Sequence, residues 1–237
     1  MSHLPMAPPP PPPSSSGWSG MPGPQARLRS PVGLSKAVMA MLGLVIVADL
    51  FALWQGNHSY RLLGRLLDDL GSVTAQEIDQ ADSLYGASGV VQFAATLATA
   101  AVFVTWFYRT RVNAEVFAPE YHTKKRAWAI WGWFVPVVNL WFPRRIATDI
   151  WNASIGARSR SRAVLNGWWA LWLVDLIFGR FAGQQYNRAR TAGEIKGAIA
   201  GLMASDVCNI AAAVLAILFV HRLTRMQHEK ALLGPGL

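Results

Sequence analysis

Residues 34–54 read LSKAVMAMLGLVIVADLFALW, an apolar stretch that ends on Trp54. A helix that crosses the hydrocarbon core of a bilayer needs about 20 mainly apolar residues, so this stretch predicts a spanning helix. Arg27, Arg29 and Lys36 stand before or near its start, as in a signal peptide. The apolar part is too long for a signal peptide, however, and no small-residue cleavage site follows it. We therefore expect an uncleaved span.

Three further stretches of this kind cover about 86–108, 163–182 and 197–220. The chain has 52% hydrophobic and 15% charged residues, where a soluble domain carries about 25% charged residues. We predict an all-α integral membrane helical bundle with four transmembrane helices, formed by residues 32–222. One cysteine and five scattered histidines give no metal-ligand spacing, so we expect no metal and no cofactor.

Both ends of the chain differ in composition from this bundle. Residues 1–31 contain six consecutive prolines followed by serines, and such a segment cannot bury enough apolar surface to order itself. We predict a disordered Pro-rich cytoplasmic tail, with a ligand for a protein partner as the alternative. We also predict a short basic cytoplasmic tail at 223–237.

Residues 127–157 form an unusual apolar segment. Its first part, 127–143, is shorter than a span and contains Pro136 in the middle and Pro143 at its end. Because proline interrupts helical hydrogen bonds, we expect a broken segment that is re-entrant or interfacial. An interfacial amphipathic helix is expected to follow, with Ile146, Ile150, Trp151 and Ile155 on one side and Arg144, Arg145, Asp149 and Asn152 on the other.

Residues 55–85 are more polar, and we expect a loop outside the membrane. Leucines at helical spacing from Leu62 to Leu70 predict one short amphipathic helix within it. Thr74 and Glu77 have the spacing of a capping box and predict the start of a second short helix.

The Lys and Arg residues predict the orientation in the membrane. With four spans, sixteen of the 22 Lys and Arg lie on the side that holds both termini. Cytoplasmic loops carry such an excess, so we predict a multi-pass protein of the cell membrane with cytoplasmic N- and C-termini. A fifth span at 127–143 would place Arg144 and Arg145 outside. The net charge of +9 then indicates contact with anionic lipid of the bilayer, and no nucleic acid partner is expected.

A motif of aromatic, proline and amide residues runs from the end of the second span into the broken segment. Its members are Trp106, Arg109, Arg111, Asn113, Trp133, Pro136, Asn139 and Pro143. The pattern resembles bacterial membrane proteins of domain of unknown function family 4328. The resemblance covers about 35–220, is most specific in 106–151, and implies a multi-helix membrane fold without an established activity.

Three carboxylates fall inside predicted spans: Asp49, Asp175 and Asp206. A charge at that depth needs a partner, a water path or a proton. At about 1.5 Å of rise per residue, these residues and Gln92 have similar depth in the outer half of the membrane. We expect one polar layer there. It would bind a cation or shuttle protons, or else form a structural network in which Arg180 neutralises one carboxylate.

Three functions remain open from the sequence. The first is a non-enzymatic multi-pass membrane protein that acts through helix packing, lipid or a partner at a Trp- and Arg-rich cytoplasmic face. That face would comprise Trp128, Trp133, Pro136, Asn139, Arg144, Arg145 and Trp151. The second is a small cation or proton transporter or channel, and the third is a lipid-modifying enzyme that depends on Asp149 or Glu120. Gly197, Gly201 and Ser205 form a small-residue face that predicts helix contact within the bundle, or a homo-oligomer.

Overall fold

The computed structural model describes residues 28–155 and 161–233, which form an all-α fold without strands. The predictions for the Pro-rich tail before residue 28 and for the last four residues lie outside this part. The elements are α1 (Val32–Asp68), α2 (Ala75–Phe117), η1 (Pro119–Tyr121), α3 (Trp128–Trp131), η2 (Val138–Leu140), α4 (Phe142–Ser154), α5 (Ala163–Arg188) and α6 (Ala192–Leu233).

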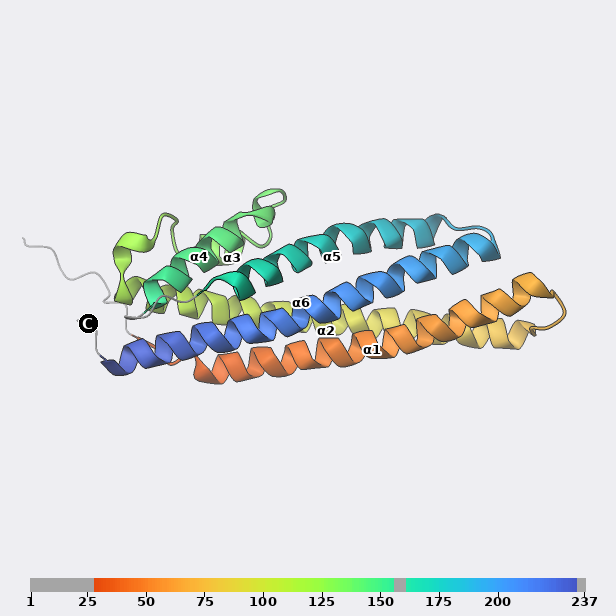
Figure 1. The fold of residues 1–237 in the computed structure, drawn as a ribbon, viewed down its shortest axis with the longest axis horizontal. Helices are drawn as coiled ribbons and strands as arrows, with labels where there is room; N and C mark the ends of the chain where they lie inside the picture. The colour runs from red at the N-terminus through yellow and green to blue at the C-terminus, as the bar shows by residue number, and fades with distance from the viewer. Residues whose placement is uncertain (1–27, 156–160, 234–237) are drawn as a thin grey trace, which may run out of the picture.

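The long helices α1, α2, α5 and α6 lie side by side as two antiparallel hairpins (Figure 1). The turns between α1 and α2 and between α5 and α6 are both at one end of the bundle. The short helices α3 and α4 are at the other end, with the C-terminal end of α6. We call these the outer and the inner end, after the predicted orientation.

The predicted loop at 55–85 is wrong, because α1 continues without a break to Asp68 and α2 begins at Ala75. The leucines at helical spacing extend α1: Leu62 and Leu63 are buried, and Leu62 packs with Val73 and Ala81 of the returning chain. The hairpin thus buries its own apolar stripe beyond the expected span. The capping box is confirmed, since Thr74 accepts from the Glu77 amide and Glu77 accepts from the Thr74 amide.

Three of the described helices, α1, α2 and α6, are long and apolar enough to cross a membrane. At about 1.5 Å per residue, the 37 residues of α1 measure about 55 Å, which exceeds a hydrocarbon core of about 30 Å. The ends of these helices therefore project beyond the core. Helix α5 is not among the three, since Asn166, Asp175 and Arg180 interrupt its apolar sequence.

The helices form a curved layer in the order α2, α1, α6, α5. Helix α1 packs along α2 and α6, and α6 packs along α5, whereas α2 and α5 make no extensive contact. A gap is thus left between α2 and α5, the two helices at the edges of the layer. What fills this gap differs between the inner and outer halves of the bundle.

Residues 128–154 form a short helical hairpin at the inner end. Helix α4 runs back along α3, and the Trp128 and Phe142 rings lie 4.9 Å apart. At the tip Val137 has φ 67° and ψ −50°, and its neighbour Val138 donates to the Pro136 carbonyl at 2.8 Å. This is a γ-turn with a strained β-branched residue at its centre. Helix α3 already ends at Trp131, and Pro136 lies in the irregular stretch between α3 and η2.

The helix predicted after this tip is confirmed as α4, but its apolar side does not face lipid. Ile146, Ile150 and Trp151 are each at most 1% exposed, and the Trp151 ring stacks on Phe219 of α6 at 6.2 Å. The amphipathic pattern arises because α4 covers the protein core.

We predict that Gly132→Ala destabilises the hairpin. A Cβ at Gly132 would lie 2.6 Å from the Trp128 carbonyl oxygen, so the backbone must shift. We expect a loss of about 1–3 kcal/mol, as for other overpacked sites, seen as a lower thermal midpoint in detergent. Gly183→Ala is the matched control, since a Cβ at Gly183 meets nothing within 4 Å. It should be neutral or slightly stabilising; equal midpoints for the two variants would contradict this account.

Candidate functional site: a groove between α2 and α5 that ends at buried carboxylates

Trp133 closes the gap between α2 and α5 in the inner half of the bundle. Its ring lies 5.5 Å from Phe103 and 5.6 Å from Phe107, both on α2. On the other side it lies 6.1 Å from Trp169 and 5.9 Å from Trp172, both on α5. The hairpin therefore inserts one indole between two helices whose own direct aromatic contact there is that of Phe103 with Trp168, at 5.6 Å. The Trp133 Nε1 is buried without a hydrogen-bond partner.

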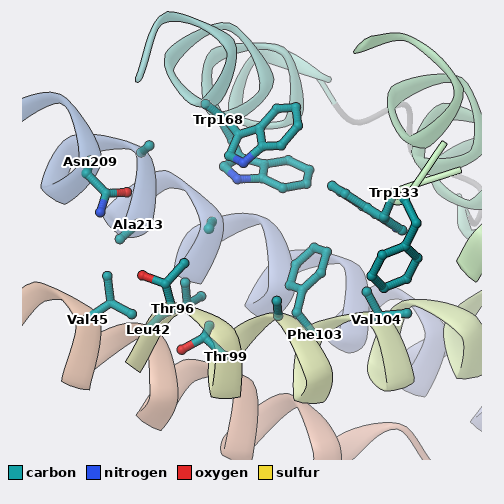
Figure 2. Close-up of a pocket in the computed structure, with 15 residues that line it drawn as sticks. Leu42, Val45, Thr96, Thr99, Phe103, Val104, Trp133, Trp168, Asn209 and Ala213 are labelled. Carbon is teal, nitrogen blue, oxygen red and sulfur yellow. The ribbon is translucent and has the colours of Figure 1, made fainter. Parts of the chain in front are cut away.

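Toward the outer end the gap stays open as a groove of about 290 Å³. Figure 2 shows Asn209 and Ala213 of α6 at its floor, with Thr96, Thr99 and Phe103 of α2 on one side and Trp168 of α5 on the other. The full lining is Leu42, Val45, Thr96, Thr99, Ala100, Phe103, Val104, Trp133, Phe134, Trp168, Trp172, Asn209, Ala212, Ala213 and Ala216. Thr96, Ala100 and Phe134 are exposed, so the groove opens sideways on the surface of the bundle.

A cluster of carboxylates and amides joins three helices at the outer side of this groove. The Gln92 side-chain amide on α2 donates to Asp49 of α1 and to Asp206 of α6, both at 2.9 Å. Asn209 of α6 donates to the second oxygen of Asp49 at 3.0 Å. Asp49 is only 1% exposed, and hydrogen bonds of this kind are what a buried carboxylate requires.

Asp175 stands beside this cluster on α5. It accepts a hydrogen bond from Ser205 of α6 at 2.8 Å. Gly179 leaves the space for this contact, because a Cβ there would lie 2.8 Å from the Ser205 hydroxyl. Gly201 likewise faces Ala182 of α5, so this part of the small-residue face of α6 serves packing within the chain. The structure thus brings Asp49, Gln92 and Asp206 into direct contact, with Asp175 held separately from α5.

The carboxylates lack a basic partner within the described part of the chain. Arg180 is exposed and forms no ion pair with any of them, and the ion pairs there join other residues. Amide and hydroxyl groups therefore make all the contacts that hold Asp49, Asp175 and Asp206.

The cluster and the groove are continuous. Each flanking helix carries a cluster residue one turn from a groove residue: Gln92 and Thr96 on α2, Asp206 and Asn209 on α6, Asp175 and Trp172 on α5. Residues three or four apart share one face of a helix. Asn209 belongs to both, since it lines the groove and binds Asp49. The groove is thus apolar along its length and acidic at its outer end.

The motif residues of α2 form a second, inner network. The Asn113 amide donates to the Arg29 carbonyl at 2.8 Å and to Gln227 at 3.3 Å, and its oxygen accepts from the Arg29 amide at 3.1 Å. Gln227 of α6 in turn donates to the Thr110 carbonyl at 2.9 Å and to Ser154 at 3.2 Å. Asn113 and Gln227 therefore tie α2, α4, α6 and the segment before α1 together. Gln227 lies in the predicted basic tail, and nothing in the sequence around it indicates that it connects these helices.

Arg111 and Glu115 extend this network toward the loop after α2. Arg111 is 2% exposed and donates to Glu115 at 3.2 Å and to the Lys124 carbonyl at 2.9 Å. Arg126 also pairs with Glu115. Burial acts to raise the pKa of the Glu115 carboxyl, but Arg126 and Arg111 outweigh it and bring the pKa below its ordinary value.

The remaining predicted residues divide between core and surface. Trp151 is buried, and Trp128 packs on Phe142. Arg144 donates to Asn166 at 3.0 Å and is exposed, as is Arg145. These two arginines lie on the surface of the hairpin together with the exposed side chains of Trp131, Phe134, Val137 and Trp141. Pro143 is buried, and Asn139 is half-buried in η2, where its backbone amide donates to Val135.

An all-helical fold with three helices long and apolar enough to cross a membrane indicates a helical membrane protein. The sequence profile of a family described as Domain of unknown function (DUF4328) matches residues 69–225, and the chain belongs to this family. The resemblance inferred from the motif is thereby confirmed. No curated protein and no solved structure matches the chain.

We predict energetic coupling between Trp106 and Thr224. The Trp106 Nε1 donates to the Thr224 hydroxyl at 3.1 Å, and both side chains are buried. A double-mutant cycle of Trp106→Phe and Thr224→Val, read by unfolding in detergent, should give a coupling of about 1 kcal/mol. Trp133→Phe with Thr224→Val is the control cycle and should be additive, because the Trp133 Nε1 has no partner. Additivity in both cycles would show that the Trp106 bond contributes nothing.

We predict that His122 makes the inner end sensitive to acid. Burial, and then the charge of Arg111, lower the pKa of His122, against smaller opposing effects of the Ala114 backbone, Asp149 and Glu115. Near and below the ordinary pKa of about 6.5, the unfolded chain binds a proton more readily than the folded chain. The free energy of unfolding therefore decreases as the pH is lowered. The thermal midpoint should drop less between pH 7.5 and 5.5 in His122→Gln than in the unaltered protein. An identical drop in both would exclude this role for His122.

Proposed function

We propose that this protein binds a cation or proton within the membrane and carries it across. The observation that carries the proposal is the cluster of Asp49, Asp175 and Asp206, which lies inside the bundle without a basic partner among the described residues. Intramembrane carboxylates are costly and mark ion and proton pathways in membrane proteins. A bound cation or proton would supply the positive charge that the chain itself does not.

The distribution of the three carboxylates supports movement rather than a fixed structural bond. Each stands on a different helix, α1, α5 or α6, and Asp175 of α5 accepts its hydrogen bond from the Ser205 hydroxyl of α6. Gln92 connects the other two and would keep them at a fixed separation. A shift of α5 along α6 would therefore alter the distance from Asp175 to the other carboxylates. Such small sliding motions of packed helices are a common route to alternating states.

The proposal places four helices across the bilayer, with α5 as the fourth span. Helix α5 has 26 residues, about 39 Å at 1.5 Å per residue, and runs beside α6. Val174, Ile177 and Phe181 are exposed on it, as side chains in contact with lipid would be. Its polar residue Asp175 is turned to Ser205 of α6. Both termini would then lie in the cytoplasm, in accord with the excess of Lys and Arg at the inner end.

A second proposed role concerns the inner hairpin, which would dip into the cytoplasmic leaflet and contact anionic lipid. Trp131, Phe134 and Trp141 are exposed there, and the exposed Arg144 and Arg145 lie in the first turn of the helix that follows. Tryptophan favours the membrane–water interface and arginine binds phosphate with two donors. This contact would seat the hairpin, and with it Trp133, between α2 and α5. It supports the carrier without performing the transport.

We predict that Asp206→Asn lowers cation or proton flux into proteoliposomes by about tenfold or more, the effect of losing about 1.4 kcal/mol of interaction. The substituted amide keeps an oxygen that accepts from Gln92, so the fold should persist and the thermal midpoint should change little. Asp79→Asn is the matched control, since Asp79 is exposed near the start of α2. Asp49→Asn and Asp175→Asn should resemble Asp206→Asn. Flux at the unaltered level in all three variants would refute the proposed function.

A further inference from the structure

We propose that the groove between α2 and α5 takes a lipophilic organic cation, with its apolar body along the groove and its positive group at Asp206. This inference rests on the proposed function, because the same carboxylates would hold the charge. It goes further by naming the class of substrate and the surface that selects it.

The lining of the groove argues for an apolar occupant. Its polar side chains are Thr96, Thr99 and Asn209, together with the indole nitrogens, and the rest is aliphatic or aromatic. A small inorganic cation would have to lose its water in such a site without gaining enough oxygen ligands. A cation whose charge is spread beneath hydrocarbon groups loses little hydration. The volume of about 290 Å³ is at the lower end of the range for small-molecule pockets.

The charge at the outer end argues for a cation. Asp206 is one turn from the groove residue Asn209, and Asp175 is one turn from the groove residue Trp172. No Lys, Arg or His lines the groove. Aromatic rings attract cations by several tenths of a kcal/mol to about 2 kcal/mol, and Phe103, Trp133, Trp168 and Trp172 are among the lining residues. The charge of the site is therefore complementary to a cation along its whole length.

The route of entry argues for a lipophilic ligand that arrives from the bilayer. The exposed groove residues Thr96, Ala100 and Phe134 lie on the side of the bundle, between α2 and α5. Trp133 blocks the inner half of the same gap. A ligand dissolved in the membrane would thus meet the opening laterally and would be stopped at the indole.

The test uses the full chain in lipid nanodiscs and two probe ions of the same shape and opposite charge, tetraphenylphosphonium and tetraphenylborate. Binding is measured by equilibrium dialysis against empty nanodiscs of the same lipid, which corrects for partition into the bilayer. Ala100→Trp fills the groove from α2. Ala98→Trp is the matched control, since Ala98 is also exposed on α2 but does not line the groove. Asp206→Asn removes the charge.

We expect tetraphenylphosphonium to bind the unaltered protein and Ala98→Trp with equal affinity. Ala100→Trp and Asp206→Asn should each weaken this binding by about tenfold or more, and tetraphenylborate should not bind above the empty nanodiscs. Equal binding of the two ions would overturn the inference. So would tetraphenylphosphonium binding that either Ala100→Trp or Asp206→Asn leaves unchanged, or no binding at all by the unaltered protein.

The two proposals fail separately. Proton or small-cation flux that is lost in Asp206→Asn, with no tetraphenylphosphonium binding, retains the carrier and overturns the lipophilic substrate. Tetraphenylphosphonium binding with the expected variant pattern, with flux unchanged in Asp206→Asn, supports the groove as a binding site and overturns the carrier.

Discussion

One side-chain amide, that of Gln92, donates to two carboxylates from different helices, and the arrangement of the bundle follows from this constraint. Asp49 and Asp206 both lie 2.9 Å from the same nitrogen. Within a membrane, no water is available to satisfy such groups, so the helices must bring their partners together. The contact fixes α1, α2 and α6 relative to one another in depth and in rotation. Helix α5, held by Ser205, Gly179 and Gly201 of the α5–α6 contact, is the element that this constraint leaves most free.

The gap between α2 and α5 gives the two halves of the bundle different characters. In the inner half, Trp133 fills the gap, and the network of Asn113, Gln227 and Arg111 anchors the chain around it. In the outer half, the gap remains open beside the carboxylates. The family motif thus builds the closed end, whereas the polar cluster lies at the end that a ligand would reach. The residues that close the inner end are therefore different from the carboxylates to which we assign the proposed function.

The sequence predicted the helices and the depth of the carboxylates, but not how the helices face one another. A rise of about 1.5 Å per residue places Asp49, Gln92 and Asp206 at one level. It does not determine rotation, so the separate attachment of Asp175 to Ser205 was not foreseen, nor was the gap between α2 and α5. The same limit explains Trp151, whose helix has an apolar side that packs on protein in place of lipid. Gln227 and Trp133 act through partners more than 25 residues away in the chain, which periodicity does not report. The helix predicted to end near Trp54 continues to Asp68, because its apolar residues beyond Trp54, such as Leu62, are buried against the returning chain.

If the carboxylates inside the bundle are open to a cation from the bilayer, they should react with a hydrophobic carbodiimide. The experiment is labelling in native membranes, followed by mass spectrometry of the peptides that contain Asp49, Asp175 and Asp206. Such reagents enter through lipid and modify protonated carboxyl groups. We expect labelling at Asp206 or Asp175 that added cations suppress. Absence of labelling at all three residues, at every pH and cation concentration, would contradict it and would mean that the cluster only holds the helices together.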